Sequence, residues 1–305
     1  MSQHAYKPGE TRHPLSAHDR TRAPQIIAAM DQLRANFSGT MREMYDQMLA
    51  GTPIAPGIVT EYIEQDGIQG WWVKPEQQTD SRAVVFIHGG GYTLGSAIAY
   101  RGFASQLAAR TGIATFVPDY PLTPEHPFPA APEALARLPG WLATQGMTQL
   151  ALAGDSAGGA LVLGLLQNPQ VAADVASAVV FSPYLDLAFT GDSFNNPATH
   201  DPIFHPEILT QLAGIYLNGT PATNGLASPL YDVPERLPPL AIQVGTDELL
   251  LDDATRYAAA AAARGGEVCL DIYEGMHHVF QSEIELEAAR HALDAAAEFI
   301  TRHWR

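Results

Sequence analysis

The clearest chemical signature in the sequence is Gly154-Asp155-Ser156-Ala157-Gly158, which lies directly between an apolar strand-like run and an apolar helix-like run. In this G-x-S-x-G pattern a sharp strand-to-helix turn lifts the serine clear of the backbone, and small flanking residues are needed because no Cβ fits there. A glycine-rich turn capped by Ser156 is the structural alternative, but the flanking runs favour catalysis. A nucleotide site is disfavoured because neither phosphate-loop pattern occurs at the glycine clusters. We therefore predict that Ser156 is a nucleophile.

A serine nucleophile needs a base that takes its proton and a carboxylate that orients the base. In strand-turn-helix hydrolases both follow the serine in sequence. His277 and His278 follow the last predicted strand and are adjacent, so at most one of them faces the site. They are not spaced as a helical metal pair, and we predict no metal and no cofactor.

The carboxylate candidates follow the preceding strand: Asp247, Glu248, Asp252 and Asp253. The last two fit the opening of the next helix, where acids favour the helix dipole. Asp247 comes just beyond the strand, at the carboxyl edge where sites of open α/β sheets form. We therefore predict Asp247 as the orienting acid.

An apolar run over residues 84–87 ends in His88-Gly89-Gly90-Gly91. Attack on an ester carbonyl creates an oxyanion, and glycines allow the main chain itself to approach it. We expect the backbone N–H groups of Gly89, Gly90, Gly91 and Ala157 to form an oxyanion hole.

These motifs together resemble the bacterial hormone-sensitive-lipase-like esterases of the α/β-hydrolase superfamily, over nearly the whole chain from residue 57 to residue 280. The matching segments are HGGGY, GDSAGG, DYPLTPEHPFPAA, GTDELLLDD and YEGMHHVF. The resemblance implies that Ser156 is the nucleophile and that His278, rather than His277, is the catalytic histidine. Pro121 and Thr123 depart from the family's loop, which has arginine and alanine at these positions. The family also implies a cap over the site.

Strand-like and helix-like stretches alternate from residue 57 onward, which predicts a mostly parallel sheet with helices on both faces. We expect an α/β-hydrolase fold with an eight-stranded central sheet. The predicted strands are 58–63, 70–73, 83–87, 114–118, 150–153, 176–181, 241–244 and 268–273. The predicted helices are 100–110, 131–144, 157–167, 252–264 and 284–303.

Two segments stand outside this alternation. Residues 1–50 contain apolar residues at helical spacing, interrupted near Phe37, and residues 186–225 form an insertion with a loop and a helix. We interpret 1–50 as a helical cap segment and 51–305 as the catalytic domain. We expect these residues to line the substrate pocket: Met41, Tyr45, Tyr92, Phe204 and Leu209.

The composition limits the partners. With 17 basic and 33 acidic residues the net charge is −16, which disfavours binding to nucleic acid or to an anionic membrane. A single cysteine, Cys269, excludes an intrachain disulfide. Neither a secretory signal nor a membrane span is evident, so we expect a cytoplasmic protein. The choice between a monomer and a homodimer stays open.

The sequence thus predicts a cofactor-free serine hydrolase of small-molecule carboxylic esters with short to medium acyl chains. Hydrolysis of lactones would use the same groups and is not distinguished. Hydrolysis of amides is less favoured because the leaving group needs better protonation. A binding protein similar to the plant gibberellin receptors is disfavoured, because those have lost the catalytic histidine.

Overall fold

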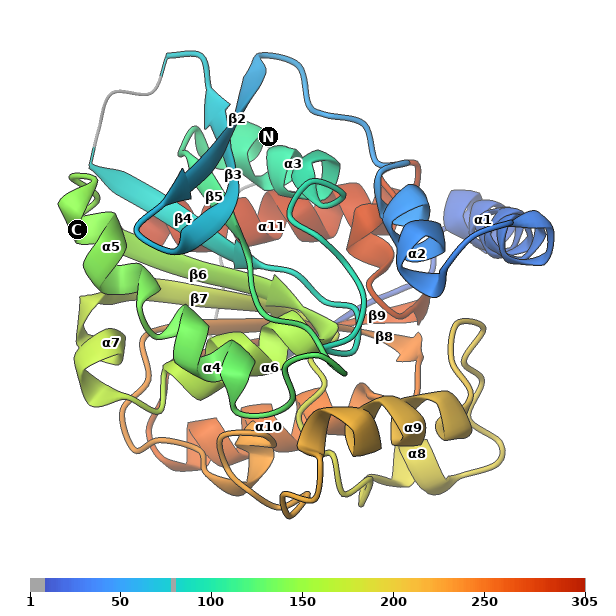
Figure 1. Cartoon of the computed structure of the whole chain (residues 1–305). Helices are drawn as coiled ribbons and strands as arrows, with labels where there is room; N and C mark the ends of the chain where they lie inside the picture. Colours follow the sequence, from blue (N-terminus) through green and yellow to red (C-terminus); the bar gives the residue numbers. More distant parts are fainter. Residues whose placement is uncertain (1–8, 78–80, 305) are drawn as a thin grey trace.

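A computed structural model of the chain describes residues 9–77 and 81–304. The strands within these ranges are β1 (Gly9–His13), β2 (Ile58–Gln65), β3 (Ile68–Pro75), β4 (Arg82–Ile87), β5 (Thr115–Asp119), β6 (Gln149–Asp155), β7 (Val175–Phe181), β8 (Leu240–Asp247) and β9 (Val268–His277). They form one nine-stranded sheet in the order β1-β9-β8-β7-β6-β4-β5-β3-β2, shown in Figure 1. Only the pairings of β3 with β5 and with β2 are antiparallel in this sheet of described residues.

The predicted mostly parallel sheet is confirmed, and all eight predicted strands are present, but the count of eight is wrong. The ninth strand is β1, which pairs in parallel with β9 at the edge of the sheet. Its sequence, GETRH, is exposed or half-exposed at every position. It therefore lacks the alternation of apolar residues from which a strand is recognised.

Helices cover both faces of the sheet (Figure 1). On one face α3 (Arg101–Thr111) and α11 (Glu287–His303) pack together and enclose a core with β4, β6 and β7. On the other lie α4 (Ala130–Leu135), α5 (Leu138–Thr144), α6 (Ser156–Leu165), α7 (Pro169–Asp174) and α10 (Leu251–Ala263). Among the described residues, no helix is long and apolar enough to cross a membrane.

Three further helices lie beyond the carboxyl ends of the parallel strands (Figure 1). They are α1 (Ala17–Asn36) and α2 (Met41–Leu49) from the N-terminal segment, and α9 (Pro206–Leu217) from the insertion, which also contains the short α8 (Asp192–Asn195). The interruption near Phe37 separates α1 from α2, and Thr40 begins α2 with a capping box to Glu43. Two short 3-10 helices, Pro229–Tyr231 and Phe280–Ser282, complete the described elements.

The register of the central strands gathers the predicted site at one edge. Ile87 pairs with Gly154, which brings the glycine loop after β4 beside the turn after β6. Asp247 pairs with His277, which brings the loops after β8 and β9 together. Residues far apart in sequence therefore meet at the carboxyl edge of the sheet.

Candidate active site

Ser156 lies on a strained turn between β6 and α6. Its φ is +51°, in the left-handed region that a residue with a side chain rarely adopts. A Cβ on Gly154 would come within 2.7 Å of the Gly158 carbonyl oxygen, and a Cβ on Gly158 would collide with the Ile87 carbonyl oxygen. The crowding that the G-x-S-x-G pattern predicts is therefore present in the structure.

The carboxylate that faces the histidine is Glu248. His278 Nδ1 lies 3.0 Å from Glu248 Oε2, and both side chains are buried. Glu248 Oε1 accepts hydrogen bonds from Ser182 Oγ at 2.9 Å and from the Gly245 N–H at 2.7 Å. Because a carboxylate only accepts, His278 Nδ1 carries the proton of this bond and Nε2 is left as the acceptor.

The prediction that Asp247 is the orienting acid is therefore wrong, because Glu248 holds that position in the structure. Glu248 lies just beyond the end of β8, and its carboxylate is the one that reaches His278. Asp247 ends β8 with a half-buried side chain that accepts from Thr246 Oγ1 at 3.0 Å. Asp252 and Asp253 lie in the first turn of α10, as predicted.

The three glycines after β4 differ in whether their backbone N–H groups already have a hydrogen-bond partner. The Gly89 N–H donates to Asp155 Oδ1 at 3.0 Å, so it is not available to an oxyanion, and its inclusion in the predicted oxyanion hole is wrong. Gly90 and Gly91 have φ of +102° and +58°, and both line the cavity that holds Ser156. Within the described residues neither N–H donates to another group. Ala157 is in the first turn of α6, where N–H groups have no partner inside the helix.

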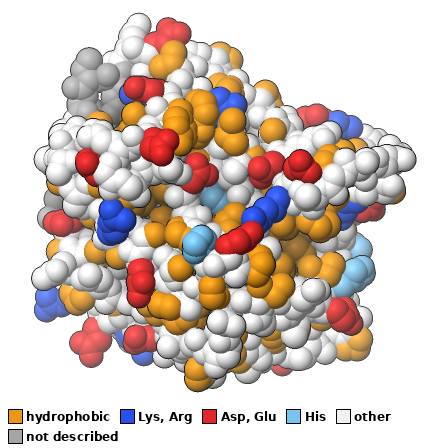
Figure 2. Space-filling view, viewed as in Figure 1, with side chains coloured by type: hydrophobic (Ala, Val, Ile, Leu, Met, Phe, Trp, Pro, Cys, Tyr) orange, Lys and Arg blue, Asp and Glu red, His pale blue; other side chains and the backbone are white. Residues whose placement is uncertain are grey.

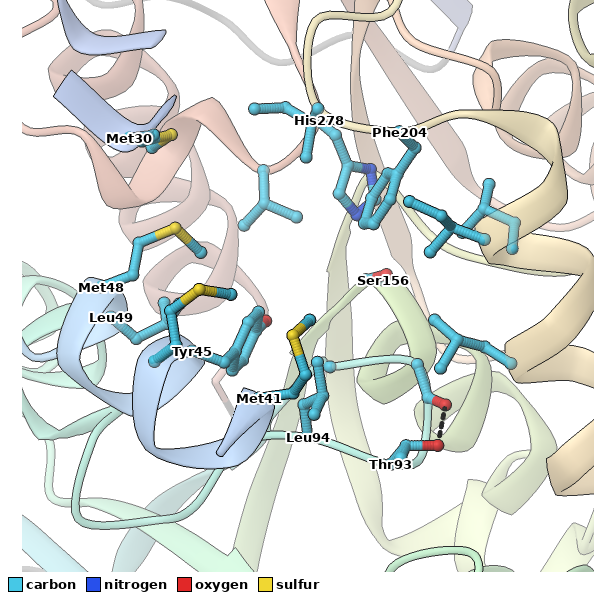
Figure 3. Close-up of a pocket in the computed structure, with 18 of the residues that line it drawn as sticks. Met30, Met41, Tyr45, Met48, Leu49, Thr93, Leu94, Ser156, Phe204 and His278 are labelled. Atoms are coloured by element: carbon cyan, nitrogen blue, oxygen red, sulfur yellow. Dashed lines mark hydrogen bonds between the residues drawn. The ribbon is translucent and has the colours of Figure 1, made fainter. Parts of the chain in front are cut away.

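Ser156 and His278 open into a cavity of about 820 Å³. Figure 2 shows hydrophobic side chains gathered between the positions of α2 and α9, and Figure 3 shows Ser156 between the methionines of α1 and α2 on one side and Phe204 and His278 on the other. The Phe204 ring meets the His278 ring edge-on at 5.0 Å. The apolar lining residues include Met30, Met41, Met44, Met48, Leu94, Ile208, Leu209, Leu212 and Ile215.

Four of the five predicted pocket residues line this cavity: Met41, Tyr45, Phe204 and Leu209. Tyr92 does not. Its side chain is buried in the core and its ring stacks on Tyr216 at 3.6 Å. The residue follows Gly91 with a φ of +62°, so the chain reverses there and turns the ring away from the site. The contribution of Met30 from α1 was missed because the sequence did not show which face of α1 meets α2.

One cluster among the described residues brings potential metal ligands together: His18, Asp19 and Glu287. The Asp19 carboxylate accepts from the N–H groups of Glu287 and Ala288 at 2.8 Å each, and from the His18 ring. These bonds cap the start of α11, so the Asp19 carboxylate has hydrogen-bond partners without a metal. None of the three residues lines the cavity that holds Ser156.

His277 is buried but lines the same cavity as His278, so the prediction that at most one of them faces the site is wrong. Its Nε2 has no hydrogen-bond partner within the described residues. Burial lowers the pKa of His277 to about 4, so the ring is neutral at the pH of an ordinary assay. A histidine whose pKa is lower in the folded protein than in the unfolded chain stabilises the fold above its unfolded pKa of about 6.5. This stabilisation is lost as pH falls from there to about 4.

We predict that His277→Gln removes this dependence. Between pH 7 and pH 5 the wild-type protein should lose about 2 kcal/mol of unfolding free energy relative to the variant, because the unfolded wild type gains a proton that the folded form does not. Urea unfolding at both pH values measures the difference. Equal pH slopes for the two proteins would show that His277 is not buried in its neutral form.

Comparison with known proteins agrees with the fold. Residues 84–282 match the family described as the alpha/beta hydrolase fold. The chain is 34% identical to a protein named "Esterase" from Acinetobacter venetianus over 273 residues, which cover 86% of this chain and 88% of that protein. It is 37% identical to a protein named "Acetyl-hydrolase" from Streptomyces hygroscopicus, with 75% of this chain and 78% of that protein covered.

Solved structures show the same relationship. The crystal structure of an esterase from the bacterial hormone-sensitive lipase family superposes with a TM-score of 0.85 at 34% identity, covering 92% of this chain and 97% of that chain. The crystal structure of EstE5 soaked with p-nitrophenyl butyrate superposes with a TM-score of 0.82 at 33% identity, covering 92% of this chain and 99% of that chain. The chain therefore belongs to the bacterial hormone-sensitive-lipase-like esterases of the α/β-hydrolase superfamily and is a carboxylic ester hydrolase.

Proposed function

We propose that the protein hydrolyses esters of short to medium acyl chains through a Ser156-His278-Glu248 triad and an acyl-enzyme intermediate. The observation that carries this proposal is the 3.0 Å contact between His278 Nδ1 and Glu248 Oε2, beside Ser156 in one apolar cavity. It replaces Asp247 with Glu248 in the triad predicted from the sequence.

In the first half of the reaction, His278 Nε2 takes the proton of Ser156 Oγ as the oxygen attacks the ester carbonyl. The N–H groups of Gly90, Gly91 and Ala157 stabilise the negative oxygen of the tetrahedral intermediate. Glu248 holds the ring orientation and stabilises the imidazolium. As the intermediate collapses, the carbon–oxygen bond to the alcohol breaks and His278 returns the proton to the leaving alkoxide.

In the second half, water attacks the acyl-enzyme while His278 takes its proton. The bond between Ser156 Oγ and the acyl carbon breaks, and His278 reprotonates the serine. The carboxylic acid leaves, and every proton is accounted for without a cofactor.

The lining of the cavity supports an apolar acyl group. Its wall is formed by methionines from α1 and α2 and by aliphatic side chains of α9, and methionine adapts readily to ligand shape. We infer that α1, α2 and α9 act as a cap, so that residues 1–50 and the insertion at 186–225 complete the catalytic domain. A relative named acetyl-hydrolase and the EstE5 structure soaked with p-nitrophenyl butyrate agree with a short acyl chain.

We predict that kcat/KM for p-nitrophenyl esters peaks at acyl chains of about four to eight carbons. Each methylene that contacts the apolar lining contributes about 0.8 kcal/mol, or roughly fourfold in kcat/KM, until the acyl chain reaches the far end of the pocket, which we expect to be closed. Initial rates from acetate to palmitate, measured below the solubility limit of each ester, give the profile. A rise that continues beyond about twelve carbons would contradict a closed pocket.

A further inference from the structure

Helix α2 contacts the loops around the catalytic centre at several polar points besides its methionines. Arg42 Nε donates to the Thr93 carbonyl oxygen at 2.9 Å, and Arg42 Nη2 donates to the Thr123 carbonyl oxygen at 2.7 Å. Ser96 Oγ donates to Asp46 Oδ2 at 2.7 Å. These contacts fix α2 against the segment that follows the glycine loop. Arg42 therefore brings a guanidinium to the loop that contains Pro121 and Thr123.

A buried chain of hydrogen bonds leads from α2 to the glycine loop itself. The Tyr45 hydroxyl lies 2.8 Å from the Tyr100 hydroxyl. The Tyr100 hydroxyl donates to Asp155 Oδ2 at 3.0 Å, and Asp155 Oδ1 accepts from the Gly89 N–H at 3.0 Å. Since the proton of Tyr100 is used on Asp155, its oxygen accepts from Tyr45, and the donors from Tyr100 and from Gly89 meet on the Asp155 carboxylate.

The two ends of this chain differ in what they touch. Tyr45 lines the substrate cavity, whereas Asp155 is buried next to the nucleophile and holds the residue before the predicted oxyanion donors. A Cβ at Gly89 would collide with the Asp155 carboxylate, so the loop packs directly against this carboxylate. Burial raises the pKa of Asp155 to about 7, and the Tyr100 hydrogen bond opposes that rise. The hydrogen bond from Tyr100 thus favours the ionised carboxylate that accepts from the Gly89 N–H.

We propose that Tyr45 is a positioning residue for ester hydrolysis, which acts through Tyr100 and Asp155 to hold Gly89 so that the next two amides face the oxyanion. This inference rests on the proposed function, because it concerns the same reaction. It gives α2 a role in transition-state stabilisation that a hydrophobic wall would not have.

The test is Tyr45→Phe, which keeps the ring in the cavity wall and removes only the hydroxyl. With p-nitrophenyl butyrate we expect kcat to fall about three- to tenfold, the scale of one neutral hydrogen bond, with KM changed less than about twofold. Affinity for a trifluoromethyl ketone with a butyl chain should weaken by a similar factor, because its tetrahedral adduct on serine places an oxyanion at the same amides. Tyr62→Phe, at an exposed tyrosine of β2, is the matched control and should leave all three constants unchanged.

The same substitution in a Tyr100→Phe background separates positioning from wall packing. If the hydroxyls act as one chain, Tyr45→Phe should then lower kcat by less than about twofold, since the chain is already broken. An undiminished effect in that background, a change confined to KM, or unchanged kcat and ketone affinity would each overturn the inference. If the parent forms no ketone adduct that depends on Ser156, the proposed function itself fails. An adduct of equal affinity in parent and Tyr45→Phe overturns the positioning role alone.

Discussion

Replacing Ser156 with alanine should lower kcat/KM for p-nitrophenyl butyrate by at least about 10³-fold, the scale for losing a triad nucleophile. The alanine lacks only the oxygen that attacks the carbonyl, so the turn between β6 and α6 should persist. A matched control is Ser38→Ala, at an exposed position between α1 and α2, which should hydrolyse the ester at the parental rate. Circular dichroism and the unfolding midpoint show whether each variant keeps its fold.

Retained hydrolysis by a Ser156→Ala preparation that carries no parental enzyme would contradict the mechanism. Activity that falls together with the unfolding midpoint would instead indicate a structural role for the turn. The two results are distinguishable because a lost nucleophile leaves the unfolding midpoint nearly unchanged.

The second large effect concerns the two adjacent acids. Glu248→Gln should lower kcat/KM by about 10² to 10⁴-fold, because the amide no longer stabilises the imidazolium and disturbs the proton on His278 Nδ1. Asp247→Asn should stay within about threefold of the parent, since Asp247 does not contact His278. Both substitutions replace a carboxylate with its amide, so each serves as the control for the other.

The reverse ranking would return the role of the acid to Asp247. Equal, severe losses would show that the loop after β8 acts through both carboxylates, and equal, mild losses would show that His278 needs no carboxylate. Either result would contradict the triad with Glu248.

The sheet could be predicted from the sequence because buried parallel strands are short apolar runs bounded by turns. Residues 150–153 and 241–244 are such runs, and both are strands of the structure. Strand β1 could not be found in this way, since GETRH is polar on both faces and its pairing with β9 is a tertiary property. The Ser156 turn was predictable because its chemistry and its backbone geometry need the same glycines.

The details of the site depended on side-chain direction, which spacing alone does not fix. The sequence does not show that Glu248 rather than Asp247 contacts His278, or that His277 lines the same cavity as His278. Gly89 could not be separated from Gly90 and Gly91, because its N–H is occupied by Asp155, a residue 66 positions away. Tyr92 was wrongly predicted to line the pocket, because its positive φ reverses the chain after the glycines and points the ring into the core.

Covalent trapping tests the central claim most directly, since the account requires Ser156 to carry the acyl group. The protein would be treated with a fluorophosphonate, and its mass, its activity and its proteolytic peptides would be followed together. The account predicts one adduct per chain, on the peptide that contains Ser156, with activity lost in proportion to labelling and no adduct in Ser156→Ala. Full ester hydrolysis by the completely labelled protein, or inactivation with the label on another residue, would contradict it.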